Sequence, residues 1–344
     1  MVDWPLFEQF FQRCPEAAEL ARRANRDRLT NQADADLKRF RGYFNELSAL
    51  VPSGKHRYLD VGASVGHSLT AAVDAGYEAH GIEADPDARH LARITHQGIV
   101  DDFARLPAID YALISLWETL EHIASPLDVL QACAERLLPD GILVVTVPNL
   151  DATSTRLLRE ECSYVHGGFN QPGHINLFSR SSLESLFKRA GLRLLASDGL
   201  YSNDAITLLA RLVRTSRGIG ANDELNIDSA LLAVLNAVGP AINIIEGLSG
   251  KQPILRCIAA REPVPESLRT RVDDWSQSRR AALAEEARGH LAGITDHLVH
   301  IKLLEQAVIE RDRMLAEQTI AYSAEIEKRD KMLEKSNRMW PWLR

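Results

Sequence analysis

The chain contains 344 residues, 45% hydrophobic and 25% charged, which is the balance of a globular protein with one large core or about two domains. Its formal net charge of -7 argues against a nucleic-acid-binding protein, because general attraction to phosphates needs a basic surface. Four widely spaced cysteines form neither a CxxC pair nor a zinc spacing and predict reduced thiols in a cytoplasmic protein.

No segment is predicted to cross a membrane. The N-terminus lacks a basic-then-apolar signal. The most apolar later stretch, 230–245, is interrupted by Asn236, Gly239, Pro240 and Asn243 and is too short for a span. The aromatic end, 339–344, leaves open a peripheral contact with a membrane surface or with a partner.

Residues 1–54 are predicted to form a helical leader. Phe40, Tyr43, Phe44 and Leu47 recur at three- and four-residue steps, which is the spacing of one buried helix face. Val51-Pro52-Ser53-Gly54 then breaks the helix before the first strand.

The most informative segment follows the leader. A strand over Arg57–Val61, a glycine turn, a helix over His67–Asp74 and a strand over Ala79–Glu83 are predicted, the order that builds a nucleoside pocket in doubly wound α/β folds. Gly62 and Gly66 allow the backbone to approach a ligand. Glu83 ends the second strand, where its carboxylate can accept bonds from two ribose hydroxyls.

The spacing of the glycine loop distinguishes two kinds of ligand. A dinucleotide loop reads G-x-G-x-x-G, whereas this one reads D-x-G-x-x-x-G with Ser64 in the middle. No Lys or Arg lies between Asp60 and Glu83, and Asp60 would repel a phosphate. A nicotinamide-dependent oxidoreductase is therefore disfavoured, and a cationic ligand that carries an amino acid fits better.

Strands and helices continue to alternate up to about residue 200. This pattern predicts a mostly parallel sheet covered on both faces. The further strands are Ile99–Asp101, Tyr111–Leu116, Ile142–Val147 and Leu192–Ala196. The further helices are Pro86–Thr95, Pro126–Leu138 and Ser181–Ala190.

Residues 264–344 are predicted to form a helical, coiled-coil tail. Apolar residues follow an imperfect seven-residue lattice at Leu298, Ile301, Val308, Leu315, Tyr322, Ile326 and Leu333. Charges of both signs are mixed along this segment, which favours pairing with a second copy or with a protein partner through 296–335. A solvated single helix is the alternative.

Five segments together resemble class I S-adenosylmethionine-dependent methyltransferases. They are Asp60–Gly66, Leu116–Ile123, the pair Leu137–Gly141 and Val144–Asn149, and Gly173–Ser179. Their order and their residue patterns resemble those of ubiquinone-type and bacterial sugar O-methyltransferases. The resemblance extends over roughly residues 55–197. Two residues depart from the family pattern: Ser64 replaces the middle glycine of the loop, and Asp140 replaces the first glycine of a later turn.

The resemblance implies a Rossmann-like sheet over 55–262, with 253–260 as a final antiparallel strand. A helical insertion over 201–250 becomes a candidate for substrate recognition or dimerisation, and the leader either covers the cofactor pocket or only packs. S-adenosyl-L-methionine is the implied cofactor. Its implied binding residues are Asp60 for the ammonium, Gly62 and Gly66 for close approach, Glu83 for the ribose, Asp101 (or Asp102) for the adenine, and Trp117 and Glu118 near the sulfonium.

Transfer to a hydroxyl needs a group that accepts its proton, and histidine suits this near neutral pH. His122 and His174 lie in segments expected at the carboxyl rim of the sheet and are the candidate bases, with His166 as a weaker third. Each could instead anchor a loop. The sequence contains no metal-ligand spacing, so a metal-dependent mechanism is not expected.

The methyl acceptor is the least specified part. By analogy with surface-polysaccharide methyltransferases that carry helical tails, we expect a hydroxyl of a glycan or nucleotide sugar. A small phenolic or quinol metabolite is the alternative. A third hypothesis is a binding or scaffold protein of weak activity that acts through its coiled coil.

Overall fold

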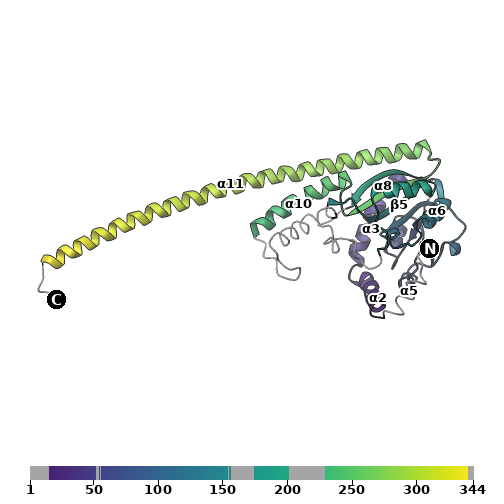
Figure 1. Ribbon diagram of the computed structural model, residues 1–344, viewed down its shortest axis with the longest axis horizontal. Helices are drawn as coiled ribbons and strands as arrows, with labels where there is room; N and C mark the ends of the chain where they lie inside the picture. Colours follow the sequence, from purple (N-terminus) through teal and green to yellow (C-terminus); the bar gives the residue numbers. More distant parts are fainter. Residues whose placement is uncertain are drawn as a thin grey trace. The chain divides into compact units, whose positions relative to one another are not determined.

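The centre of the protein is a seven-stranded sheet with the order β3-β2-β1-β4-β5-β7-β6 (Figure 1). The structure is a computed structural model, and it describes residues 15–51, 54, 56–153, 155, 174–200 and 229–339. The strands are β1 (Arg57–Val61), β2 (Glu78–Ile82), β3 (Ile99–Val100), β4 (Tyr111–Trp117), β5 (Leu137–Pro148), β6 (Leu192–Leu200) and β7 (Ile254–Arg261). Strands β1 to β5 pair in parallel, and β7 is antiparallel to both β5 and β6. The predicted Rossmann-like fold class is confirmed.

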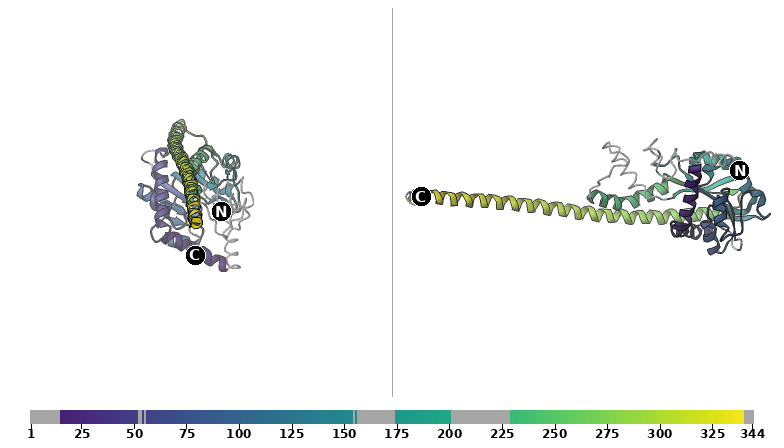
Figure 2. Two further views of the ribbon diagram at one scale, coloured as in Figure 1. Left: turned by 90° about the vertical axis from the view of Figure 1, so that its left-hand side faces the viewer. Right: turned by 90° about the horizontal axis from the view of Figure 1, so that it is seen from below.

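Helices cover both faces of this sheet (Figures 1 and 2). On one face, α3 (Ala33–Leu47), α4 (His67–Asp74) and the start of α11 (Glu266–Met339) pack in one apolar cluster. On the other face, α6 (Pro126–Arg136) and α8 (Arg180–Arg189) form a second cluster. Neighbouring strand residues such as Tyr58 and Leu59 belong to different clusters, because side chains alternate across a strand. Strands buried on both faces explain the long apolar runs in the sequence.

The strand boundaries differ from the prediction at β5. The sequence predicted a helix up to Leu138 and a strand from Ile142, whereas α6 ends at Arg136 and β5 begins at Leu137. Tyr111 pairs with Leu137 and Leu113 pairs with Ile142, with a register shift between them. The turn-like residues 138–141 thus form an irregularity within the strand, because Pro139 has no N–H to continue the ladder.

Three further elements also end earlier or later than predicted. Helix α5 (Pro86–Ala92) stops before the predicted Thr95, and β3 ends at Val100. Strand β6 extends past the predicted end at Ala196 to Leu200, because the residues after Ala196 also pair with β7.

The leader is helical, as predicted, in its described part. It contains α2 (Pro15–Thr30), α3 and the short η1 (Ser48–Leu50). Phe40, Phe44 and Leu47 are buried against the sheet, so the apolar face of α3 is the one that the residue spacing predicted.

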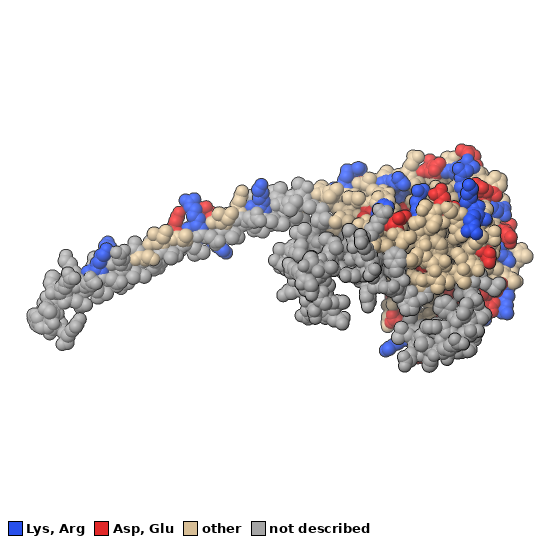
Figure 3. Space-filling model, viewed as in Figure 1, with Lys and Arg blue, Asp and Glu red and all other residues tan. Residues whose placement is uncertain are grey.

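Helix α10 (Ser229–Ser249) lies within the predicted insertion, of which 201–228 are outside the described residues. Ala241 of this helix is buried. Among the residues described, no helix combines the length and the apolar character that crossing a bilayer requires. On the face shown in Figure 3, basic and acidic side chains are interspersed over the described residues of the part of the chain that carries the sheet.

The chain divides into two compact units, Met1–Arg288 and Gly289–Arg344. This boundary differs from the predicted start of the tail at residue 264, because Val264, Leu268 and Val272 are buried in the core of the first unit. The described part of the second unit is the remainder of α11, in which Ile309, Met314 and Ile320 are exposed. The side chains of the predicted seam lie outside those described, so the coiled coil stays a prediction.

Candidate cofactor and active site

A cavity of about 690 Å³ lies where the parallel strands β1, β2, β3 and β4 end. Ligands of open α/β sheets bind at this edge, outside the carboxyl ends of the strands. Seven residues chosen from the sequence line the cavity: Asp60, Gly62, Glu83, Asp101, Trp117, Glu118 and His122.

The glycine loop after β1 needs left-handed backbone at three positions. Gly62, Ser64 and Gly66 have φ values of +88°, +51° and +91°. A Cβ on Gly62 would lie 2.5 Å from Cγ2 of Thr119, so only glycine fits there. Gly66 is the N-cap of α4 and is not among the lining residues. Its missing Cβ instead makes room for His96, whose Cδ2 would lie 3.1 Å away.

The carboxylate of Glu83 is held by backbone amides. The N–H of Ser64 donates to Oε2 at 2.7 Å, and the N–H of Asp85 donates to Oε1 at 2.8 Å. Burial raises the pKa of Glu83 to about 7. Each oxygen keeps a second lone pair, so this geometry suits two ribose hydroxyls.

We expect the affinity for S-adenosylmethionine to fall as the pH is lowered through about 7 in the wild type, because protonation of Glu83 removes an ionised acceptor. Replacing Glu83 by Gln should weaken binding by about 1–3 kcal/mol and flatten this pH dependence. Isothermal titration of both proteins at several pH values measures the effect. Equal affinities for wild type and Glu83→Gln would remove Glu83 from the site.

The carboxylate of Asp60 is almost fully buried, with 2% exposure. Its oxygens accept hydrogen bonds from the hydroxyls of Ser68 and of Ser115, the latter at 2.8 Å. Burial raises its pKa to about 6. An ammonium group would therefore share an oxygen that already accepts a hydroxyl bond.

The two acids after β3 have different surroundings. Asp102 caps the short helix η2 (Phe103–Arg105) by accepting from the N–H of Ala104 at 2.8 Å. Asp101 pairs with Arg105 at 3.0 Å through Oδ2, while its buried Oδ1 has no hydrogen-bond partner among the described residues. Asp101 therefore has a buried acceptor that an adenine amino group could use, while one oxygen of Asp102 is already engaged in the helix cap.

Trp117 forms part of both the core and the cavity wall. Its ring stacks on Tyr43 of α3 with centroids 4.9 Å apart, and its Nε1 donates to the hydroxyl of Tyr58 at 3.1 Å. The next residue, Glu118, has a φ of +49°. Its N–H donates to the backbone oxygen of Thr146 at 3.0 Å. Left-handed backbone at a residue other than glycine is strained and recurs at functional sites.

Polar residues of the leader also line the cavity, and the sequence did not single them out. They are Asn25, Arg28, Gln32, Asp36 and Arg39. Arg28 donates to the hydroxyl of Ser64 at 3.2 Å, and Asn25 donates to Oδ2 of Asp85 at 2.8 Å. Of the two roles that the sequence left open for the leader, the structure favours the one in which it covers the pocket.

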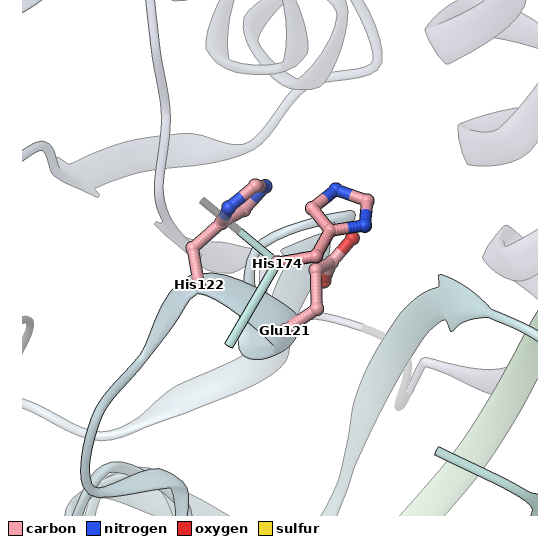
Figure 4. Close-up of side chains that lie close together, drawn as sticks. All are labelled: Glu121, His122 and His174. Carbon is pink, nitrogen blue, oxygen red and sulfur yellow. The ribbon is translucent and has the colours of Figure 1, made fainter. Parts of the chain in front are cut away.

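The two candidate bases lie beside one another (Figure 4). The rings of His122, in η3 (Leu120–His122), and of His174 have centroids 4.7 Å apart. The carboxylate of Glu121 lies next to them, is 1% exposed and has no hydrogen-bond partner among the described residues. Burial raises the pKa of Glu121 to about 8. His174 is not among the lining residues of the cavity, and His166 lies outside the described residues.

The strand order and a glycine loop joined to an acid after β2 define a nucleoside-binding α/β enzyme. A family model described as a methyltransferase domain matches residues 20–197, so the chain belongs to that family. The protein is an S-adenosylmethionine-dependent methyltransferase.

Curated relatives carry the same activity in their names. The chain is 26% identical over 188 residues to a ubiquinone biosynthesis O-methyltransferase of Cereibacter sphaeroides. The aligned segment covers 52% of this chain and 74% of the relative. It is 31% identical over 130 residues to a ubiquinone biosynthesis O-methyltransferase of Xylella fastidiosa. That aligned segment covers 35% of this chain and 52% of the relative.

Similar solved structures include two methyltransferases. A SAM-dependent methyltransferase from Archaeoglobus fulgidus has 15% identity and a TM-score of 0.44, over 66% of this chain and 93% of that one. The mitomycin 7-O-methyltransferase MmcR has 17% identity and a TM-score of 0.42, over 74% of this chain and 60% of that one.

Proposed function

We propose that this methyltransferase transfers a methyl group to a hydroxyl oxygen of a small acceptor. The observation that carries the proposal is the imidazole of His122 on the cavity wall, 4.7 Å from that of His174. A hydroxyl that gains a methyl group must lose its proton, and a positioned imidazole accepts protons near neutral pH.

The residues of the cavity divide between binding and transfer. Bound S-adenosylmethionine supplies a methyl group on a positively charged sulfur. We assign Glu83 to the ribose, Asp101 to the adenine amino group and Asp60 to the ammonium, with Gly62 allowing close approach. Trp117 ends β4 and Glu118 follows it; we assign both to the transfer region, where a carboxylate and an aromatic face favour a cation. His122 is the first candidate for the acceptor's proton.

We propose a glycan or nucleotide-sugar hydroxyl as the acceptor. The support is the polar character of the leader at the cavity, where Arg28, Gln32, Asp36 and Arg39 offer both donors and acceptors. Such groups suit a ligand with several hydroxyls, because each buried hydroxyl needs a partner. The names of the curated relatives favour a second acceptor class, a phenol or quinol hydroxyl.

The purified full chain should release S-adenosylhomocysteine only when a suitable acceptor is present, and mass spectrometry of the product should place the methyl on oxygen. Nucleotide sugars, glycans and dihydroxylated phenols form the panel. His122→Ala should lower turnover by about 100-fold or more while cofactor affinity stays the same. Methylation of nitrogen or carbon would contradict the proposal, and turnover of phenols alone would select the second class.

We further propose that 296–335 mediate self-association or docking to a protein partner, and that the enzyme is cytoplasmic, with peripheral membrane contact as the alternative. The support is the heptad-like spacing and the mixed charge of the tail. Deleting 296–344 should lower the number of chains per particle, measured by light scattering and corrected for the shorter chain, without loss of cofactor binding. An unchanged number would count against self-association.

A further inference from the structure

We propose that Glu121, His122 and His174 form a binding site for a divalent transition-metal ion. The sequence predicted no metal site, because His174 lies far along the chain from the adjacent pair Glu121 and His122. The fold brings them together: each of the three residues offers one ligand atom, and these atoms all lie within 4.8 Å of one another (Figure 4). Two ligands at about 2.1 Å from one ion are at most about 4.2 Å apart, so binding needs only small side-chain adjustments.

Glu121 supplies the first independent reason to expect a cation. Its side chain is 1% exposed, and neither carboxylate oxygen has a hydrogen-bond partner within the described part of the chain. A buried carboxylate is costly unless it is paired with a cation or coordinates a metal. A metal ion between Glu121 and the imidazoles would satisfy it.

The backbone around the cluster supplies a second reason, because it holds the ligands in place. The N–H groups of Ile175 and Asn176 both donate to the backbone oxygen of Glu121 at 3.0 Å. The side-chain amide of Asn176 donates to the backbone oxygen of Ile123 at 2.6 Å. The segment that starts with His174 is thus tied to η3 on both sides of His122.

The ligand set indicates the kind of ion. Two imidazoles and one carboxylate suit zinc or another first-row transition ion, whereas magnesium prefers oxygen ligands. Three protein ligands leave at least one coordination position open. His122 lines the cavity, so that position is expected to face the acceptor.

The consequence for catalysis rests on the proposed function. An ion at this position would lower the pKa of an acceptor hydroxyl that coordinates it. The hydroxyl proton then leaves to water, the oxygen forms its bond to the methyl carbon, and the carbon–sulfur bond breaks with its electron pair on sulfur. In this arrangement His122, the residue proposed above to help remove the acceptor's proton, acts by holding the ion, and the ion favours the deprotonated oxygen.

The test uses the full chain after treatment with a chelator. Titration with Co²⁺ should give visible absorption bands that saturate at one ion per chain, Zn²⁺ should displace them, and Mg²⁺ should not. Glu121→Gln and His174→Ala should each weaken Co²⁺ binding by about 100-fold. The matched controls, Glu135→Gln and His90→Ala, change exposed residues of the same types and should bind as the wild type. Cofactor affinity of each variant checks that the fold is retained.

Absence of the bands, or equal binding by all variants, would overturn the metal site. Turnover assays separate this result from the fate of the proposed function. Full O-methylation in the presence of chelator, with no bound ion, would reject the metal site and leave the proposed function standing. Site-specific Co²⁺ binding without turnover of any hydroxyl acceptor would support the metal site and reject the proposed function.

Discussion

Replacing Arg256 by Met is expected to lower the free energy of unfolding by about 3–5 kcal/mol. Arg256 lies on β7 with a fully buried side chain. It donates to both oxygens of Glu46 at 3.1 and 2.8 Å and to both oxygens of Asp198 at 2.9 and 2.6 Å. The variant would leave two partly buried carboxylates without this partner. Arg279, which also pairs with both acids, limits the loss.

The measurement is urea unfolding followed by circular dichroism, with Arg41→Met as the matched control. Arg41 also joins α3 to another element, donating to Asp74 of α4 at 2.9 Å, but both side chains of this pair are about half exposed. Exposed ion pairs contribute little, so the control should unfold close to the wild type. Equal losses in the two variants would show that burial of Arg256 is not what stabilises this contact.

This network explains why the leader and the start of α11 belong to the enzyme's core unit. Glu46 lies on α3, Asp198 on β6, Arg256 on β7 and Arg279 on α11. The guanidinium of Arg256 also lies 5.4 Å from the ring centroid of Trp275, within the range of a cation–π contact. The sequence did not indicate this network, because the partners of the arginine in the apolar strand β7 are distant along the chain.

The sheet could be predicted because its strands are short apolar runs bounded by glycine, proline and acids. β4 is buried along nearly its whole length, so its sequence is almost entirely apolar and is easily recognised. The glycine loop and Glu83 could be placed for the same reason, because they follow strands directly. Where a strand includes turn-like residues, as at Pro139 and Asp140 in β5, the prediction failed.

The remaining part of the site depends on contacts between distant segments. Residue spacing identifies the apolar face of α3, but it does not show what the polar residues of the leader meet. Arg28 contacts Ser64 across 36 positions of sequence. Likewise, the acids after β3 are equivalent in sequence, and only their contacts in the fold distinguish them: Asp102 caps η2, whereas Asp101 pairs with Arg105. The cluster of Glu121, His122 and His174 arises from loop packing, which no local pattern encodes.

Replacing Gly62 by Ala is expected to weaken cofactor binding by about 100-fold, or roughly 3 kcal/mol. One cause is the left-handed backbone, with a φ of +88°, which costs any residue with a Cβ about 1–2 kcal/mol. The other is steric, because the new Cβ would lie 2.5 Å from Cγ2 of Thr119 and 3.0 Å from its Cβ. Thr119 is held by its hydroxyl, which donates to the backbone oxygen of Trp117 at 3.0 Å. Relief of the clash therefore displaces the cavity wall after β4.

Gly76→Ala separates the two causes. Gly76 has nearly the same φ, +89°, but a Cβ added there would have nothing within 4 Å of it, and Gly76 is not among the cavity residues. This control should lose stability and keep its cofactor affinity in isothermal titration. The double variant Gly62→Ala with Thr119→Ala should recover part of the lost affinity, because the clash is reduced while the backbone strain stays. Wild-type affinity in Gly62→Ala alone would mean that the loop shifts freely and that close approach at Gly62 has no role in binding.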